Sequence, residues 1–262
     1  MQHLLNRLAS SWLQKVHPRI VSFVTFSSIA WLSASALTLY LLANLSEEVL
    51  EQESFAFDQH ILLYIHQFAN PVLDNLMLGA TRMGDPRTVV PLTILVFCFL
   101  WWKHYRLEAK FFALNAFGGA VLSNVLKLVF TRSRPDLWPQ LISDDTFSYP
   151  SGHATGSVVL YGFLSYLFVI LYPRYATIWR LIGAVLIIAI GFSRLYLGVH
   201  WPTDILAGYG IGLLWVYGLH YADAATSVLS PPSSLTISDD RTPNELEAYI
   251  VKRHRVNTQA IY

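Results

Sequence analysis

The chain has 262 residues, of which 54% are hydrophobic and only 13% are charged. Soluble domains of this size carry about 25% charged residues, so this composition, with its long apolar runs, indicates an integral membrane protein. The formal net charge of +1 and the absence of a long basic stretch give no support to a nucleic-acid partner, and the single cysteine, Cys98, excludes an internal disulfide and a thiolate metal cluster.

Six apolar segments are each long enough to cross the hydrocarbon core of a bilayer, which takes about 20 helical residues. They lie at residues 20–45, 86–103, 108–130, 152–172, 179–198 and 203–221. The first segment has an alternative interpretation as a signal peptide, because "SASA" at residues 33–36 resembles a cleavage site. The apolar run continues through "LTLYLLANL", which favours an uncleaved anchor. The predicted fold is therefore an all-α, integral membrane bundle of six helices.

The segments outside these spans divide the chain further. Residues 46–85 are too polar for another span but rich in aromatic and branched residues, so we expect an amphipathic helical segment at the outer interface between spans 1 and 2. Residues 1–19 are expected to be a cytoplasmic segment and 20–222 the membrane domain. Residues 223–262 are rich in Ser, Pro and Asp, which predicts a flexible cytoplasmic tail.

Basic residues in the connections predict the orientation, since cytoplasmic loops of membrane proteins carry an excess of Lys and Arg. With six spans, one side receives Arg7, Lys15, Arg19, Lys103, Arg106, Lys110, Arg174, Arg180, Lys252, Arg253 and Arg255. Both termini are then cytoplasmic, and the acidic "SEEVLEQESFAFD" stretch lies outside. The compact loops favour the inner membrane of a bacterium, so the outer face is predicted to be periplasmic.

Ionisable side chains near a bilayer are costly and often functional. Three clusters reach the predicted outer face: Lys127, Arg132 and Arg134 after the third span; His153 at the fourth; and Arg194, His200 and Asp204 around the fifth and sixth. Each cation taken alone is equally well explained as an interfacial anchor that extends to the head groups. Together with two histidines, the cations indicate a site for an anion.

The stretch "YPSGHATG", residues 149–156, places His153 at the start of a membrane-length helix. Free amide groups and the helix dipole favour phosphate at such a position. Gly152 lets the backbone come close to a ligand, because it has no side chain. The alternative is a structural histidine that is satisfied by a backbone partner.

His200 and Asp204 are four residues apart, and Pro202 suits the first turn of the helix that begins there. The carboxylate can reach one imidazole nitrogen, fix the tautomer and leave the other nitrogen free as a nucleophile. Asp204 as a simple helix cap is the alternative.

In order and spacing, these residues resemble the signature of the type 2 phosphatidic acid phosphatases. Lys127 is followed after six residues by Arg134-Pro135; next comes Pro150-Ser151-Gly152-His153; and Ser193-Arg194 precedes His200 and Asp204. The resemblance covers roughly residues 55 to 220. It implies a six-helix membrane bundle and metal-free hydrolysis of phosphoesters through a phosphohistidine.

The resemblance also implies a role for each matching position. His200 attacks phosphorus, Asp204 orients it, and His153 protonates the leaving oxygen; the phosphate oxygens are bound by Lys127, Arg134, Ser151, Gly152 and Arg194. Three fixed cations stand where other phosphatases use magnesium, so neither a metal nor another cofactor is expected.

The expected partners are the bilayer and a lipid phosphate substrate, with no obligate protein partner. We favour a polyprenyl diphosphate, notably undecaprenyl pyrophosphate, with phosphatidylglycerophosphate and phosphatidate as alternatives. Asp144 and Asp145 in the loop "DLWPQLISDDTFSY" are expected to repel excess negative charge. A lipid phosphotransferase or a haloperoxidase that holds vanadate remains an alternative use of the same residues. An anion transporter is the alternative of a different class, although its basic residues would lie nearer the membrane midplane.

Overall fold

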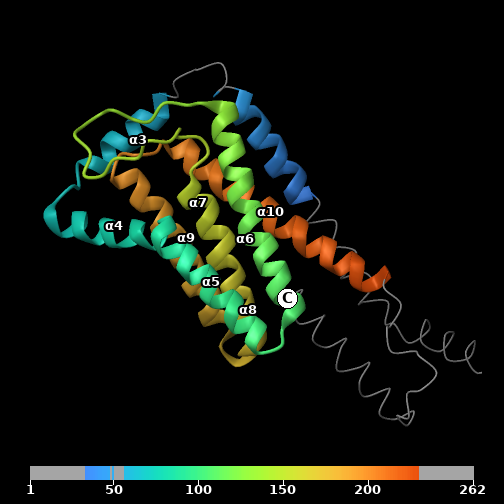
Figure 1. The fold of residues 1–262 in the computed structure, drawn as a ribbon. Coiled ribbons are helices and arrows are strands. Elements are labelled where there is room, and N and C mark those ends of the chain that lie inside the picture. Colours follow the sequence, from blue (N-terminus) through green and yellow to red (C-terminus); the bar gives the residue numbers. More distant parts are fainter. Residues whose placement is uncertain (1–32, 48, 50–55, 230–262) are drawn as a thin grey trace, which may run out of the picture. The chain divides into compact units, whose positions relative to one another are not determined.

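A computed structural model describes residues 33–47, 49 and 56–229, with side chains as far as residue 218, and every regular element among them is helical (Figure 1). The chain divides into two units, residues 1–44 and 45–262. In the first unit the described residues are helical. Most of the predicted first span, the N-terminal segment 1–19 and most of the predicted tail lie outside the described residues.

The second unit contains helices joined mostly by short connections. In chain order they are α3 (Ala56–His66), α4 (Pro71–Met83), α5 (Pro86–Trp102), α6 (Arg106–Phe130), α7 (Gly152–Ser157), the π-helical turn η1 (Val158–Gly162), α8 (Phe163–Leu171), η2 (Pro173–Tyr175), α9 (Ala176–Tyr196) and α10 (Pro202–Leu229). The prediction of an all-α chain is confirmed for the described residues. Helices α5, α6, α7 to α8, α9 and α10 lie where the second to sixth spans were predicted.

Among the described residues, three helical stretches are long and apolar enough to cross a membrane: Arg106–Phe130, Gly152–Leu171 and Pro173–Tyr196. Helices α4 and α5 together form a fourth candidate that is bent by 43°. The count of six spans therefore stays a prediction, and so does the interfacial position of residues 46–85, which contain α3 and α4. Helix α10 continues to Leu229, so the start of the predicted tail is helical.

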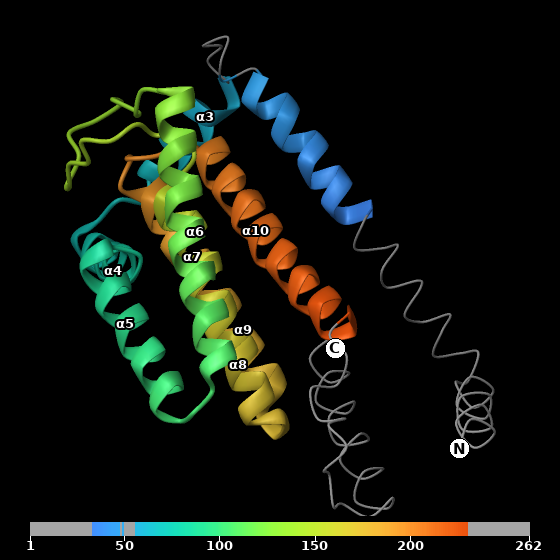
Figure 2. The ribbon, with the colours of Figure 1, turned by 45° about the vertical axis from the view of Figure 1, so that its right-hand side comes forward.

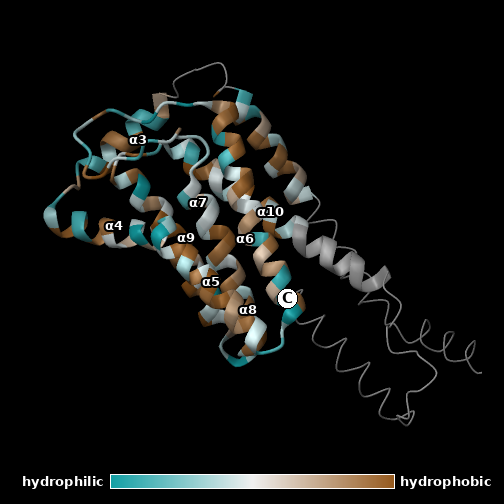
Figure 3. Cartoon of the chain, viewed as in Figure 1, coloured by the Kyte–Doolittle hydropathy of each residue, from teal (hydrophilic) through white to brown (hydrophobic). Residues whose placement is uncertain are grey.

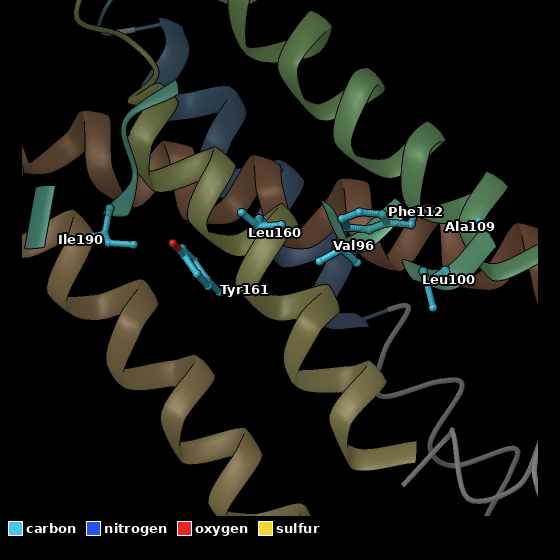
Figure 4. Packing of buried hydrophobic residues seen from close by; sticks show 7 residues of the cluster. All are labelled: Val96, Leu100, Ala109, Phe112, Leu160, Tyr161 and Ile190. Carbon is cyan, nitrogen blue, oxygen red and sulfur yellow. The ribbon is translucent and has the colours of Figure 1, made fainter. Parts of the chain in front are cut away.

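The main hydrophobic core lies between α5, α6, η1 and α9 (Figure 4). Its buried members are Val96, Leu100, Ala109, Phe112, Leu160, Tyr161 and Ile190. The rings of Phe112 and Phe163 add an aromatic contact with centroids 4.7 Å apart. Because these side chains come from four elements, the core fixes the helices against one another.

The π-helical turn η1 is tied to its neighbours by one buried amide. A π-turn changes the helical hydrogen-bond register and leaves carbonyl groups for other donors. The side chain of Asn115 on α6 donates to the carbonyl oxygen of Val159 at 3.0 Å. The backbone carbonyl oxygen of Asn115 accepts from Trp215 Nε1 of α10 at 3.0 Å. The turn is thus held against α6, which in turn is held against α10.

The polar part of the second unit lies at one end of its helices. Figures 1 and 2 show that α3, the loop after α6, the start of α7, the end of α9 and the start of α10 gather there. Figure 3 shows hydrophobic residues along α5, α8 and α9, and hydrophilic residues at α3 and in the loop between α6 and α7. The elements that carry the predicted site residues therefore meet at this end.

Candidate active site

The short turn between α9 and α10 positions His200. Gly198 has φ of +71°, a conformation that a residue with a side chain rarely adopts, and Trp138 packs directly against it. Gln140 Nε2 donates to the carbonyl oxygens of Gly198 and Pro135, each at 2.7 Å. The turn is therefore held by the loop after α6.

His200 and Asp204 form the pair that their spacing predicted. Nδ1 of His200 lies 3.2 Å from Oδ2 of Asp204, and both side chains are buried. The same oxygen accepts from the backbone N–H of Trp201 at 2.8 Å, which is the reciprocal bond of a helix capping box. One carboxylate thus caps α10 and also contacts the imidazole, so Asp204 is more than a simple cap, and its role in catalysis stays a prediction.

The other nitrogen of His200 faces a cation. Arg134 Nη1 lies 3.2 Å from His200 Nε2 and donates to the carbonyl oxygen of Val199 at 2.6 Å. Burial, together with the charges of Arg194 and Arg134, holds the pKa of His200 well below its ordinary value of 6.5. The ring is therefore neutral at pH 7. With a proton on Nδ1 shared with Asp204, the lone pair of Nε2 points toward Arg134.

A second arginine, Arg132, binds the carboxylate oxygen of Asp204 that does not contact His200. Arg132 Nη1 donates to Asp204 Oδ1 at 2.7 Å, and Nη2 donates to Asp58 Oδ2 at 3.0 Å. Asp58 also accepts from the hydroxyl of Thr203 at 2.6 Å and from its backbone N–H at 3.1 Å. Burial raises the pKa of Asp58, although its bonds to Thr203 and Arg132 act against this. We call Asp204, Arg132, Asp58 and Thr203 the buried network.

The three predicted phosphate-binding cations converge on one stretch of the loop after α6, residues 144–147. Lys127 Nζ donates to the hydroxyl of Thr146 at 3.2 Å and to the carbonyl of Phe147. Arg134 Nε donates to the carbonyl of Thr146 at 2.7 Å. Asp144 Oδ2 lies 2.9 Å from Arg134 Nη2 and 3.0 Å from Arg194 Nη2.

Arg194 is the most deeply enclosed of these cations. Its Nη1 donates to the hydroxyl of Thr81 on α4 at 2.9 Å. Its Nε is buried and has no hydrogen-bond partner within the part of the chain that the structure describes. A buried guanidinium N–H without an acceptor is costly, so an oxygen that bound this atom would remove that cost.

The "PSGH" motif forms the first turn of α7. Ser151 caps the helix, since its hydroxyl accepts from the N–H of Ala154 at 3.4 Å, and its own N–H donates to the carbonyl of Asp204 at 3.1 Å. A Cβ at Gly152 would lie 3.7 Å from Cε of Lys127. His153 is half-buried beside Gly84, whose own Cβ, if present, would lie 2.9 Å from its Cδ2.

The donor set of the site is cationic. Among the residues that the structure describes, no group of three or more His, Cys, Asp or Glu side chains is arranged to hold a metal ion. The prediction of a site without a metal stays a prediction, to be tested with a chelator.

The chain is similar to known proteins. The pattern of the PAP2 superfamily matches residues 108–226. Over 147 residues the chain is 31% identical to phosphatidylglycerophosphatase B of Bacillus subtilis, a match that covers 55% of this chain and 72% of the relative. The chain belongs to the PAP2 superfamily. This PAP2 chain is also 29% identical over 170 residues to an undecaprenyl-diphosphatase of Sulfolobus acidocaldarius, covering 62% of this chain and 76% of the relative.

A solved structure extends the similarity to the fold. It is described as the first transmembrane PAP2 type phosphatidylglycerolphosphate phosphatase from Bacillus subtilis, and it superposes with a TM-score of 0.66 and 26% identity. The match covers 73% of this PAP2 chain and 96% of the other. The relatives confirm the predicted family and the predicted enzyme class, a lipid phosphatase among the phosphoric ester hydrolases. They also agree with a membrane protein.

Two groups of this site were not identified from the sequence. Asp58 and Thr81 precede the matched family pattern, which begins at residue 108, and neither belongs to the three motifs. Asp58 gives a weak signal, because it lies four residues before the buried Leu62 of α3, on the same helical face. Arg132 was grouped with the anion site, whereas the structure places it in the buried network.

Proposed function

We propose that this chain is a metal-independent lipid phosphate phosphatase that forms a phosphohistidine on His200. One observation carries the proposal. Nδ1 of His200 is held 3.2 Å from Asp204, while Nε2 lies 3.2 Å from Nη1 of Arg134. A neutral imidazole thus directs its lone pair to the place where a guanidinium would hold a phosphate, which is the geometry that nucleophilic phosphoryl transfer requires.

The reaction proceeds in two displacements. The lone pair of His200 Nε2 forms a bond to phosphorus while the bond to the leaving oxygen breaks, and that oxygen takes the electron pair and a proton from His153. Asp204 stabilises the positive charge that develops on the ring. His153, now neutral, removes a proton from water; the water oxygen bonds to phosphorus, and the bond to Nε2 breaks. Free phosphate leaves, and His153 is again protonated.

The cations hold the transferring group. Lys127, Arg134 and Arg194 bind the nonbridging oxygens, together with the hydroxyl of Ser151 and the amide of Gly152. Fixed positive charge in a site with little water stabilises the transition state, since phosphoryl transfer depends more on position and charge than on covalent help. The unpartnered Nε of Arg194 supports this assignment.

We propose a polyprenyl diphosphate at the outer face of the membrane as the substrate. The site lies at one end of apolar helices, so a lipid can present its phosphate while its tail stays in the bilayer (Figure 3). A second candidate, phosphatidylglycerophosphate, is supported by the similarity to the Bacillus subtilis enzyme named for it. The outer orientation can be checked in intact cells: an impermeant thiol reagent should label Ser143→Cys and leave Thr177→Cys unlabelled.

Trapping the intermediate tests the mechanism. The protein is mixed briefly with a ³²P-labelled lipid phosphate, quenched under alkaline denaturing conditions and digested. Label should appear on the peptide that contains His200, be absent in His200→Ala, and persist in His60→Ala, a control at an exposed histidine of α3. Turnover without any labelled histidine would refute the phosphohistidine. Transfer of label to an added alcohol rather than to water would identify a phosphotransferase.

Competition identifies the substrate. The kcat/KM values for a polyprenyl diphosphate and for phosphatidylglycerophosphate are compared in the same mixed micelles. A preference of tenfold or more for the glycerolipid, about 1.4 kcal/mol of transition-state binding, would exclude the polyprenyl diphosphate as the preferred substrate.

A further inference from the structure

The carboxylate of Asp144 occupies the centre of the cationic cluster. Its Oδ2 lies 2.9 Å from Arg134 Nη2 and 3.0 Å from Arg194 Nη2, so a single oxygen bridges two guanidinium groups. Its Oδ1 accepts from the hydroxyl of Thr146 at 3.1 Å, and the same hydroxyl accepts from Lys127 Nζ at 3.2 Å. One loop carboxylate therefore contacts two of the three cations directly and the third through Thr146.

The contacts of Asp144 occupy N–H donors of Arg134 and Arg194 that a bound phosphate would also use. An oxygen bound between Arg134 Nη2 and Arg194 Nη2 occupies the position of a nonbridging phosphate oxygen. A second anion at that position would meet a carboxylate within a few ångströms, where like charges repel by several kcal/mol when they are partly screened from water. A phosphate oxygen can bind between these two Nη2 atoms only after Asp144 has moved away.

The two arginines do not depend on Asp144 for their positions. Arg134 is also held by the carbonyl oxygens of Val199 and Thr146, at 2.6 and 2.7 Å. Arg194 is also held by Thr81 at 2.9 Å. Asp144 itself lies on a loop with its side chain 25% exposed, whereas the side chain of Arg194 is 3% exposed. The carboxylate is thus the partner that can leave while the cations stay in place.

We propose that Asp144 is an internal competitor of phosphate, displaced when a phosphate group binds and returning to expel the inorganic phosphate that the reaction releases. The inference rests on the proposed function only in taking Arg134 and Arg194 as phosphate ligands. Three enclosed cations would retain a free phosphate dianion strongly. A carboxylate that takes its place offsets this affinity and keeps the product from blocking the site.

The neighbouring Asp145 provides a matched control. It carries the same charge one residue later in the same loop and is exposed. Asp144→Asn and Asp145→Asn therefore remove the same charge at almost the same distance from the membrane. A general electrostatic effect of the loop would appear in both variants, whereas displacement at the two arginines would appear in Asp144→Asn alone.

The first experiment measures binding of inorganic phosphate to the full chain in nanodiscs by calorimetry, together with inhibition of turnover by phosphate. Asp144→Asn should lower both the Kd and the inhibition constant about tenfold, equivalent to 1.4 kcal/mol. Asp145→Asn should leave both within about twofold of the unchanged protein. An unchanged or weaker affinity in Asp144→Asn would overturn the inference, because Asp144 would then orient the arginines rather than compete with phosphate.

A second experiment uses the unaltered chain and so does not depend on a variant that folds. Amide hydrogen exchange of residues 141–148 is measured with and without saturating inorganic phosphate. Displacement of Asp144 should break the bond from the Thr146 N–H to Asp144 Oδ1, which is 3.5 Å long in this structure, and so increase exchange at that amide. Slower exchange, or no phosphate binding at all, would overturn the inference.

Neither binding nor exchange requires turnover, so the two proposals fail separately. If Asp144→Asn tightens phosphate binding but no lipid phosphate is hydrolysed, the proposed function fails and the competition at the arginines stands. If the lipid is hydrolysed through His200 and Asp144→Asn binds phosphate no more tightly, the competition fails and the proposed function stands.

Discussion

Two arginine–carboxylate networks lie side by side in this site and differ in burial. Arg132 joins Asp204 and Asp58, whose side chains are 0% and 1% exposed. Arg134 and Arg194 share Asp144, whose side chain is 25% exposed and carried by a loop. Removing one partner of an enclosed ion pair leaves a buried charge without compensation, whereas an accessible partner can be replaced by water or by another anion. Similar chemistry thus provides a fixed support in the buried network. In the other network, Arg134, Arg194 and Asp144, which we call the exchangeable network, it provides a ligand site.

Asp204→Asn should have the largest effect on kcat, because it changes the member of the buried network that contacts His200. The amide cannot stabilise an imidazolium as a carboxylate does, and it can hold the ring in the wrong tautomer. A loss of kcat on the order of 10,000-fold is expected when the carboxylate beside a catalytic imidazole is removed. Single-turnover kinetics measures the loss. A change confined to KM would mean that Asp204 acts in binding alone.

Asp58→Asn tests the part of the buried network that does not contact His200. Arg132 would then be balanced by Asp204 alone, so less of that carboxylate's charge would remain for His200. We expect a loss of stability of about 3 kcal/mol and a kcat about tenfold lower, with KM little changed.

Thermal unfolding in detergent and steady-state kinetics give both values for Asp58→Asn. Asp136→Asn, at an exposed position of the loop after α6, is the control and should match the unchanged chain. A destabilised Asp58→Asn protein with normal kcat would show that the support from Asp58 is structural only.

The pH dependence of phosphate binding should show whether Asp144 competes as a carboxylate anion or takes up a proton. Burial raises the pKa of Asp144, but Arg134 and Arg194 outweigh it, so the pKa lies below the ordinary value. For a carboxyl with a depressed pKa, the charge is present above the ordinary value and is lost only as the pH falls through the depressed one. Asp144 therefore stays ionised from about pH 8 to about pH 5.

Over that range, the ratio of phosphate Kd between the unchanged chain and Asp144→Asn should stay constant. The protonation of phosphate itself affects both proteins equally and cancels in the ratio. Calorimetric titrations at several pH values provide the measurement. A ratio that falls toward one as the pH is lowered to 5 would show that Asp144 takes up a proton instead of competing as an anion.

Chelation should have the smallest effect. Excess EDTA is expected to leave kcat and KM unchanged, because the fixed cations Lys127, Arg134 and Arg194 supply the charge that a metal provides in other phosphatases. Initial rates before and after dialysis against the chelator provide the check. Loss of turnover that magnesium restores would show that the cationic site is incomplete without a metal.

The sequence predicted the helical class well because the signal, a run of apolar residues of membrane length, is local. Five apolar segments of membrane length, such as residues 108–130, correspond to helices in the structure, since about 20 apolar residues in a row have few other stable forms. The break at the π-turn η1 was not predicted. Its contact with Asn115, whose side-chain amide donates to the carbonyl oxygen of Val159, joins residues 44 positions apart.

The site was predictable to the extent that its residues stand in short motifs. The spacing of four between His200 and Asp204 lets the carboxylate in the first turn of α10 reach back to the imidazole just before that helix, and the motif "PSGH" is enough to place His153 at a helix start. The motifs do not include Asp58 or Thr81. Each is a single polar residue on another helix, and each contacts an arginine of the site that is distant in the sequence.

By itself the sequence determined the chemical groups of this protein: three cations, two histidines and a carboxylate, placed in or beside the ends of apolar helices that cannot leave ionisable side chains in lipid without cause. Only the tertiary structure decided how the charges are paired. Asp58 lies far along the chain from Arg132, and Asp144 far from Arg194, and a charge interacts with whatever lies within a few ångströms, at a strength that burial sets. Neither the distance nor the burial is a property of sequence spacing. For this reason Asp58 supports Arg132, Asp204 and His200 from within the fold, while Asp144 lies between Arg134 and Arg194.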